Sequence, residues 1–284
     1  MKKLRLLNFL PLLMAIPSII IGVLAMYISK VPIAIFVQNI FYFILAGIIS
    51  YFILLKKSKA KNNACINATT IIVAVILLFL TFISSGIEGV HRWVSVGPIR
   101  FYVAAIVIPV IIIELWKLLQ IRGWWFSATI TIVISILLTL QPDASMLTAF
   151  TIPMILLLWN KININIFRSC IVVLLSALII ISWVFLDKLP PVSYVENIIS
   201  LVANMGIIWL SLGVVSLAIL PLPFIFFSPK KYKLLSVSIG MYFIIILTST
   251  LFGNFPVPLM GYGVSPITGY FISITWYAKS KINS

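Results

Sequence analysis

Long apolar runs recur along almost the whole of this 284-residue chain, and they constrain its fold more than any other feature. The mean hydropathy is +1.24 and 63% of the residues are hydrophobic, a composition that soluble globular domains do not have. A helix crosses the apolar core of a bilayer in about 20 residues. The runs therefore predict an all-α polytopic membrane protein, with residues 1–284 as a single transmembrane domain. The ten predicted spans are 6–28, 32–55, 66–84, 101–120, 125–140, 145–159, 166–186, 194–222, 233–252 and 267–278.

The formal net charge of +15 could indicate a nucleic-acid partner, so the placement of the basic residues matters. With ten spans, only Lys30, Arg92, Arg100 and Lys188 of the 20 basic residues lie on one side, which leaves sixteen (20 − 4) on the other. Loops with excess Lys and Arg face the cytoplasm. We therefore expect a protein surrounded by lipid, with both termini cytoplasmic and no nucleic-acid partner. The sixteen are Lys2, Lys3, Arg5, Lys56, Lys57, Lys59, Lys61, Lys117, Arg122, Lys161, Arg168, Lys230, Lys231, Lys233, Lys279 and Lys281.

A polar stretch at residues 85–100 follows the third predicted span and faces the outer side. It contains Arg92 and Trp93, a cation and an indole that suit an anionic head group at the membrane interface. Both residue types are also common at interfaces, where they contact bulk lipid. Residue types alone leave both interpretations open.

A second signature, Gln141-Pro142-Asp143, ends the fifth predicted span. A carboxylate at this depth needs a water-filled cavity or a cationic partner, unless Asp143 is a solvated residue that ends the turn. Residues 125–159 could also form one long helix. Pro142 favours a break, and two separate helices keep Lys161 on the same side as the other basic residues.

The third signature, NFPVPLMGYGVSP at 254–266, has no charge, and its prolines and glycines prevent a continuous helix. Irregular backbone at membrane depth requires shelter from protein or a water-filled cavity. The Gly-Tyr-Gly sequence also occurs in potassium filters, but a pore helix cannot pass through Pro256 and Pro258.

The chain offers few groups for catalysis. His91 is its single histidine, so no Ser-His triad can be assembled, and the two cysteines are too far apart in sequence to suggest a zinc site. Acid–base chemistry would have to use one of five carboxylates: Glu88, Glu114, Asp143, Asp187 and Glu196.

In their order and placement, the three signatures resemble those of the SEDS family, typified by FtsW, RodA and SpoVE. The family's Gly-Ala-x-Arg-Trp-x-x-x-Gly reads GVHRWVSVG at 89–97, and its Gln-Pro-Asp is Gln141 to Asp143. Its Pro-x-Pro-x-x-Ser-Tyr-Gly-Gly-Ser reads PVPLMGYGVS at 256–265, with Gly261 and Val264 as departures. The resemblance covers essentially the whole chain.

The resemblance implies work on the cell wall, by a protein of the bacterial plasma membrane. SEDS proteins have ten membrane helices and polymerise the glycan strand of peptidoglycan from lipid II, an undecaprenyl-linked precursor, usually beside a class B penicillin-binding protein. It implies that Arg92 contacts the lipid pyrophosphate and that Asp143 lines a central cavity. No cofactor is evident from the residues, and a divalent metal is implied by the family alone. The substrate-binding residues that we predict are Arg92, Trp93, Asp143, Pro258, Tyr262, Gly263 and Ser265.

This chain departs from the family where the family's key aspartate should lie. The large outer loop before the eighth helix is short here, and Leu189-Pro190 and Met205-Gly206 align that aspartate with Val195. Glu196 lies one residue later, which turns a helical side chain by about 100°. The family's Gln-Pro-Ser-Glu at the fourth helix is replaced by YVAA at 102–105. Glu196 is therefore a weak catalytic candidate, and the catalytic group stays unassigned.

The sequence thus predicts a short, divergent SEDS-like protein of peptidoglycan assembly, cell shape or cell division, with a degenerate catalytic site. Whether it is an enzyme is left open. One alternative is a transporter or flippase of a lipid-linked precursor, suggested by the broken segment at 254–266 and the nearby Asp143. The other is a non-catalytic scaffold for a penicillin-binding protein.

Overall fold

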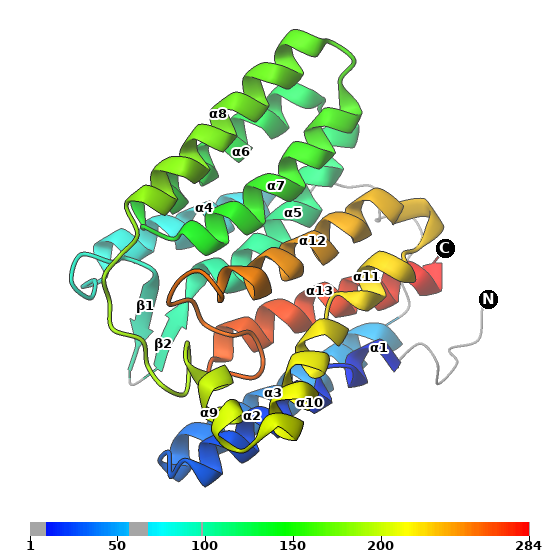
Figure 1. Cartoon of the computed structure of the whole chain (residues 1–284). Coiled ribbons are helices and arrows are strands. Elements are labelled where there is room, and N and C mark those ends of the chain that lie inside the picture. The colour runs from blue at the N-terminus through cyan, green and yellow to red at the C-terminus, as the bar shows by residue number, and fades with distance from the viewer. Residues whose placement is uncertain (1–9, 57–67, 98, 284) are drawn as a thin grey trace. The chain divides into compact units, whose positions relative to one another are not determined.

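The computed structural model describes residues 10–56, 68–97 and 99–283 (Figure 1). Its contacts divide the chain into two compact units, each described here by itself. Unit 1 comprises 1–57 and 189–284, and unit 2 comprises 58–188. Unit 2 contains α4 (Ala68–Ile83), β1 (Trp93–Val96), β2 (Ile99–Tyr102), α5 (Val103–Ile121), α6 (Trp124–Leu140), α7 (Ala144–Lys161) and α8 (Asn165–Val184). Unit 1 contains α1 (Leu10–Leu13), α2 (Ile16–Ile28), α3 (Ile33–Leu55), α9 (Ile198–Asn204), α10 (Ile207–Ile219), α11 (Leu222–Phe226), the short 3-10 helix η3 (Lys230–Tyr232), α12 (Lys233–Ser249) and α13 (Val264–Asn283).

Unit 2 is a helical bundle with a small hairpin at one end. Helix α5 lies at its centre, packs against α4, α6 and α7, and is the most buried of its membrane-length helices. Helices α6, α7 and α8 pack side by side as an antiparallel set (Figure 1). Strands β1 and β2 pair antiparallel, with Trp93 opposite Tyr102. The hairpin thus leads directly from the loop after α4 into α5.

Three hydroxyl side chains of α6 are satisfied within the helix. The hydroxyls of Thr131, Ser135 and Thr139 each donate to the carbonyl four residues earlier, at 2.7–2.8 Å. Such a bond removes the cost of placing a hydroxyl in an apolar interior. Small residues at helix contacts also let neighbouring backbones approach closely.

Unit 1 is built around α2, α3 and α13, which come from opposite ends of the chain. Helix α3 packs along α13, and α2 packs against α3, α9 and α10. The hydroxyl of Ser18 on α2 donates to the carbonyl of Ser216 on α10 at 3.0 Å. Gly22 permits close contact as well, because a Cβ there would overlap the carbonyl oxygen of Met260.

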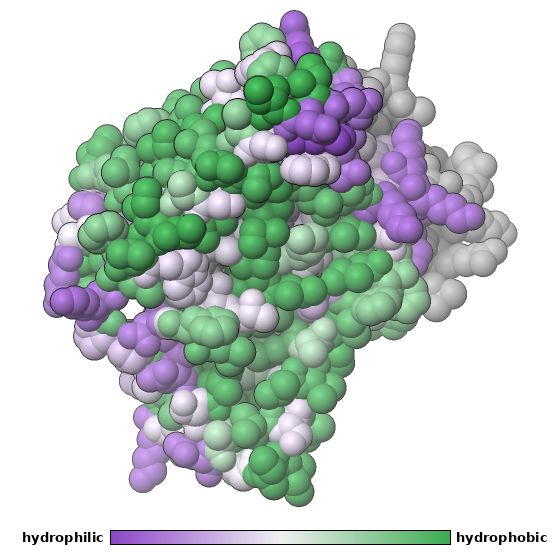
Figure 2. Space-filling model, turned by 45° about the horizontal axis from the view of Figure 1, so that its top comes forward, coloured by the Kyte–Doolittle hydropathy of each residue, from purple (hydrophilic) through white to green (hydrophobic). Residues whose placement is uncertain are grey.

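The prediction of a polytopic all-helical membrane protein is confirmed, and the small β-hairpin is an addition to it. Among the described residues, seven helices are long and apolar enough to cross a membrane, and α4 and α6 are shorter apolar helices. Figure 2 shows apolar surface over much of the face in view, with hydrophilic side chains mostly toward its edges. The starts of the first and third predicted spans lie outside the described residues, as do the basic residues Lys2, Lys3, Arg5, Lys57, Lys59 and Lys61.

Three predicted spans differ from the observed elements. The described part of the span at 6–28 is divided into α1 and α2 by a turn at Met14 and Ala15. The span at 194–222 contains two helices, α9 and α10, and ends where α11 begins. The chain breaks at Gly206, where φ is +118°, and again at Pro221, the residue before α11. The helix in the span predicted at 101–120 begins two residues later than predicted, at Val103, because Phe101 and Tyr102 belong to β2. The break between α6 and α7 falls at 141–143, as Pro142 predicted.

Candidate functional site

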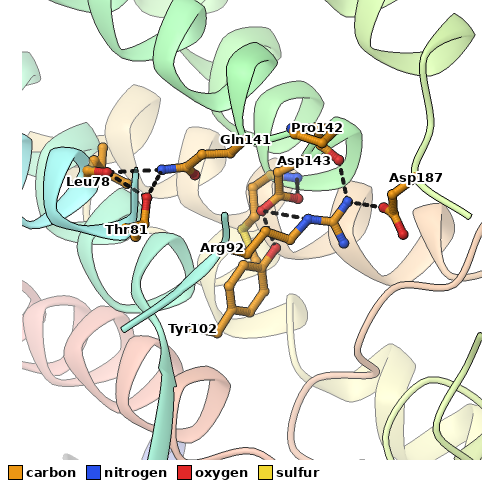
Figure 3. A network of polar contacts seen from close by, with 9 residues as sticks. Leu78, Thr81, Arg92, Tyr102, Gln141, Pro142, Asp143 and Asp187 are labelled. Atoms are coloured by element: carbon orange, nitrogen blue, oxygen red, sulfur yellow. Dashed lines mark hydrogen bonds and ion pairs between the residues drawn. The ribbon is translucent and has the colours of Figure 1, made fainter. Parts of the chain in front are cut away.

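Arg92 is the centre of a polar network in unit 2 (Figure 3). It lies just before β1, and its side chain is only 3% exposed. One terminal nitrogen of the guanidinium donates to the carbonyl of Pro142 and to the carboxylate of Asp187. Its Nε lies 3.9 Å from Oδ2 of Asp143. A buried cation needs such partners, since burial of an isolated charge is very costly.

Asp143 is fully buried and acts as the N-cap of α7. Its Oδ1 accepts from the backbone N–H of Met146 at 3.2 Å, and its Oδ2 accepts from the hydroxyl of Tyr102 at 2.5 Å. The guanidinium of Arg92 lies 3.9 Å from the same Oδ2. The carboxyl therefore has a cationic partner, as its depth in the membrane requires, and it is not a solvated residue of the turn.

Gln141 attaches the same turn to α4. Its side-chain nitrogen donates to the carbonyl of Leu78 at 3.1 Å and to the hydroxyl of Thr81 at 2.8 Å (Figure 3). Each residue of Gln141-Pro142-Asp143 thus binds a different segment: α4, the guanidinium of Arg92, and the first turn of α7. The turn is a joint between elements as well as a candidate binding site.

Trp93, the other predicted residue of the first signature, is half-buried on β1. Its ring centroid lies 6.3 Å from that of Tyr102, its partner in the hairpin. The hairpin therefore brings Trp93, Arg92 and Tyr102 to one end of unit 2. The sequence singled out neither Tyr102 as the partner of Asp143 nor Asp187 as the partner of Arg92, because Tyr102 lies at the start of an apolar run and Asp187 begins a loop.

The third signature belongs to unit 1, where α3 fixes its backbone. The side-chain amide of Asn39 donates to the carbonyl of Gly261 and accepts from the N–H of Gly263, both at 3.1 Å. The hydroxyl of Tyr262 donates to Oε1 of Gln38 at 2.8 Å. Burial, followed by the nearby Tyr42 and Tyr194, raises the pKa of Tyr262, so its hydroxyl stays a neutral donor.

Sequence reasoning missed Gln38 and Asn39. Asn39 is 1% exposed in the middle of an otherwise apolar helix. The sequence did contain an indication of their role, because two adjacent side-chain amides inside a 23-residue apolar helix need hydrogen-bond partners at membrane depth. The sequence alone could not show that those partners lie more than 220 residues away.

Three other predicted residues lie in or beside the same segment. Pro258 is buried, Gly263 is half-buried, and Ser265 is 2% exposed in the first turn of α13. Within the described part of the chain, the hydroxyl of Ser265 has no hydrogen-bond partner. The protein itself shelters the irregular backbone, as the prediction required.

The short segment before α9 also contacts the third signature within unit 1. The N–H of Tyr262 donates to the carbonyl of Tyr194 at 2.8 Å, and the N–H of Val257 donates to the carbonyl of Val195 at 3.3 Å. Glu196 is half-buried, and its Oε2 accepts from the N–H of Val192 at 2.8 Å. Val195, which the sequence comparison aligned with the family's key aspartate, therefore contributes only its backbone carbonyl to a contact with the third signature. The carboxylate of the adjacent Glu196 caps a turn.

The residues present do not form a ready site for a divalent metal. Among the described residues, no group of three or more His, Cys, Asp or Glu side chains is close enough to hold one. The two carboxylates of the polar network, those of Asp143 and Asp187, both face the guanidinium of Arg92. A cation would have to compete with that guanidinium for the same oxygens.

Comparison with known proteins identifies the fold. No family model matches the sequence, and no curated protein does. The structure is similar to the rod shape determining protein RodA of Thermus thermophilus, with 15% identity and a TM-score of 0.70 over 94% of this chain and 95% of that chain. An aspartate-to-alanine variant of the same protein gives 15% identity and a TM-score of 0.69 over 94% and 96%.

A third similar chain comes from a structure described as the structural coordination of polymerization and crosslinking by a peptidoglycan synthase complex. Its identity is 14% and its TM-score 0.59, over 95% of this chain and 97% of that chain. These similarities confirm the resemblance that the three signatures predicted. Over nearly its whole length, this chain has the fold of RodA, an all-helical protein with many membrane-length helices.

Proposed function

We propose that this protein acts in peptidoglycan assembly, where it binds an undecaprenyl-linked precursor such as lipid II, or a partner in wall synthesis, without polymerising the glycan strand. The RodA-like fold supports the general role. The observation that carries the non-polymerising role is the turn at 192–197. It has Val195 where the family has its key aspartate, and Glu196 is engaged as a cap.

Arg92 is the group best suited to the precursor. A guanidinium binds phosphate oxygens through paired N–H donors, and a low-dielectric setting strengthens that attraction. The carboxylate of Asp187, which is 9% exposed, is the partner of Arg92 that an arriving pyrophosphate would displace. Asp143 would stay beside the guanidinium when the pyrophosphate binds, since it is fully buried and is hydrogen-bonded to Tyr102 and to the N–H of Met146.

Polymerisation needs a further group, because a base must take the proton of the acceptor sugar hydroxyl. Val195 cannot accept a proton. The Glu196 carboxylate already accepts from the N–H of Val192 at 2.8 Å. The chain can therefore recognise the precursor with Arg92 while it lacks the proton acceptor at the expected position.

The test is a lipid II assay with purified protein in liposomes, with and without a class B penicillin-binding protein. We expect retention of labelled lipid II, weakened by Arg92→Lys, and no glycan strands. Long strands that disappear with Glu196→Ala would overturn the proposal. Failure to retain lipid II, together with failure to bind the penicillin-binding protein in a pull-down, would also overturn it.

The same liposomes distinguish the alternative function. A flippase would move labelled lipid precursor from one leaflet to the other, whereas a binding protein leaves the distribution unchanged. The broken segment at 254–263, which suggested a carrier, is fixed by Asn39 and by the turn at 192–197. We therefore expect no transport. Both termini should face the cytoplasm, so that Arg92 lies on the outer side, where lipid II is used.

A further inference from the structure

An aromatic groove lies in unit 2, at the end opposite to the Arg92 network. It has a volume of about 170 Å³ and is formed by the first turns of α6 and α8, which pack against each other. Trp124, Trp125 and Phe167 form its mouth, and Ile171 and Leu174 continue it along α8. The groove is apolar and opens onto the surface that the helices present to lipid.

The aromatic walls of the groove are fixed in place. The ring of Trp125 meets that of Trp124 edge-on at 5.0 Å and that of Phe167 at 4.9 Å. The indole N–H of Trp124 donates to the carbonyl of Leu158 at 3.2 Å. Trp125 is nevertheless 60% exposed. An exposed indole held by two half-buried rings at the end of a membrane helix is suited to contact with an acyl chain just below its head group.

Three cations lie beside the helix ends at the groove. Arg122 lies two residues before Trp124, Arg168 directly follows Phe167, and Lys161 ends α7. The hydrogen-bond acceptors of the last two are neutral: Lys161 donates to Gln120, and Arg168 donates to Asn163 and to the carbonyl of Trp159. None of the three cations forms an ion pair within the described part of the chain. The mouth therefore has positive charge that no carboxylate in the described chain neutralises.

The helix ends add to that charge. Helices α6 and α8 both begin at the groove, and neither has an acidic residue in its first turn or a side-chain cap. The first N–H groups of a helix have no partner within it, and the helix dipole is positive at that end. Arg168 lies in the first turn of α8, where a cation is unfavourable unless an anion is near.

We infer that this groove is a binding site for one anionic phospholipid, with its phosphate between Arg122 and Arg168 and its acyl chain against Trp125 and Phe167. The charge of the mouth and the apolar walls together match a negatively charged amphiphile of the surrounding leaflet. The site is separate from the proposed function, since it uses none of the residues of the Arg92 network.

Tryptophan quenching by brominated lipid tests the inference directly. The protein is placed in vesicles of equal parts phosphatidylglycerol and phosphatidylcholine, and bromine is carried on the acyl chains of either one lipid or the other. The head-group composition is identical in both preparations, so the surface charge cannot cause a difference. We expect stronger quenching when phosphatidylglycerol carries the bromine.

Variants locate the effect. Arg122→Gln combined with Arg168→Gln should abolish the difference between the two preparations, and Trp125→Phe should remove most of it. The matched controls Lys279→Gln, which neutralises a basic residue of α13, and Trp209→Phe, which removes an indole from α10, should leave it unchanged. Circular dichroism confirms that each variant keeps its helices. Equal quenching of the unmodified protein, or a difference that survives the loss of both arginines, would overturn the inference.

Discussion

At the scale of single residues, one guanidinium holds three segments of unit 2 together. Arg92 contacts Asp143 at the start of α7, the carbonyl of Pro142, and Asp187 after α8. The sequence predicted Arg92 and Asp143 as site residues, because charges are rare in membrane segments and mark sites. It could not predict Tyr102 and Asp187, since nothing in a tyrosine after an apolar strand or an aspartate in a loop indicates the distant residue that it will meet.

Loss of the guanidinium should destabilise the fold strongly. Arg92→Ala leaves the buried Asp143 and the nearly buried Asp187 without their cation, and breaking a buried pair in this way costs about 3–5 kcal/mol. Arg92→Lys should recover part of that loss. Thermal unfolding in detergent, followed by circular dichroism, measures both.

Arg100 offers a matched control in the same hairpin. It lies exposed on β2, so Arg100→Ala should change the stability by no more than about 0.5 kcal/mol. Equal melting temperatures for Arg92→Ala and Arg100→Ala would show that the polar network contributes nothing to the fold.

At the scale of the elements, glycine and proline determine where helices break and where they approach. The sequence predicted the break at Pro142, but it missed the one at Gly206 because the surrounding run is apolar throughout. It also offered no reason to distinguish one helical glycine from another. The structure does so, since Gly22 on α2 meets the carbonyl of Met260, whereas a methyl group added at Gly47 on α3 would have only the ring of Phe271 nearby, at 3.9 Å.

The two glycines should respond in opposite ways to alanine. Gly22→Ala pushes a methyl group into backbone that cannot rotate away, and such overpacking costs about 1–3 kcal/mol or more. Gly47→Ala meets ordinary contact distances, and alanine favours a helix over glycine by about 1 kcal/mol. The melting temperature should fall for the first variant and stay the same or rise for the second. A tolerated alanine at position 22 would contradict the close packing of α2 on the third signature.

At the scale of the whole molecule, hydropathy and charge predicted most of the architecture. The observed helices follow the ten predicted spans within a few residues over most of the described chain, because span length is set by bilayer thickness and not by tertiary contacts. The contacts that fix the candidate site join residues far apart in sequence. No pattern along the chain specifies such pairs, so the site was only partly predictable.

The orientation is a prediction that reporter fusions can check. With the basic residues on the cytoplasmic side, green fluorescent protein fused after Lys281 should fluoresce, and alkaline phosphatase at the same place should be inactive. Phosphatase fused after Lys188 should be active. A fusion after Asn163 adds a further check, because it lies on the cytoplasmic side only if α6 and α7 are separate spans. Active phosphatase at Lys281 would reverse the whole topology.

The division of unit 1 between the two ends of the chain determines the order in which the protein can be assembled during synthesis. Residues 58–188 are contiguous, so unit 2 can complete its contacts as soon as α8 leaves the ribosome. Helices α2 and α3 are made first but must wait, because Ser18 finds Ser216 and Asn39 finds Gly261 and Gly263 only near the end of translation. Until then, the amide of Asn39 lacks these partners, and an unsatisfied polar group at membrane depth is costly. Asn39 thus makes correct assembly of the first helices depend on arrival of the last.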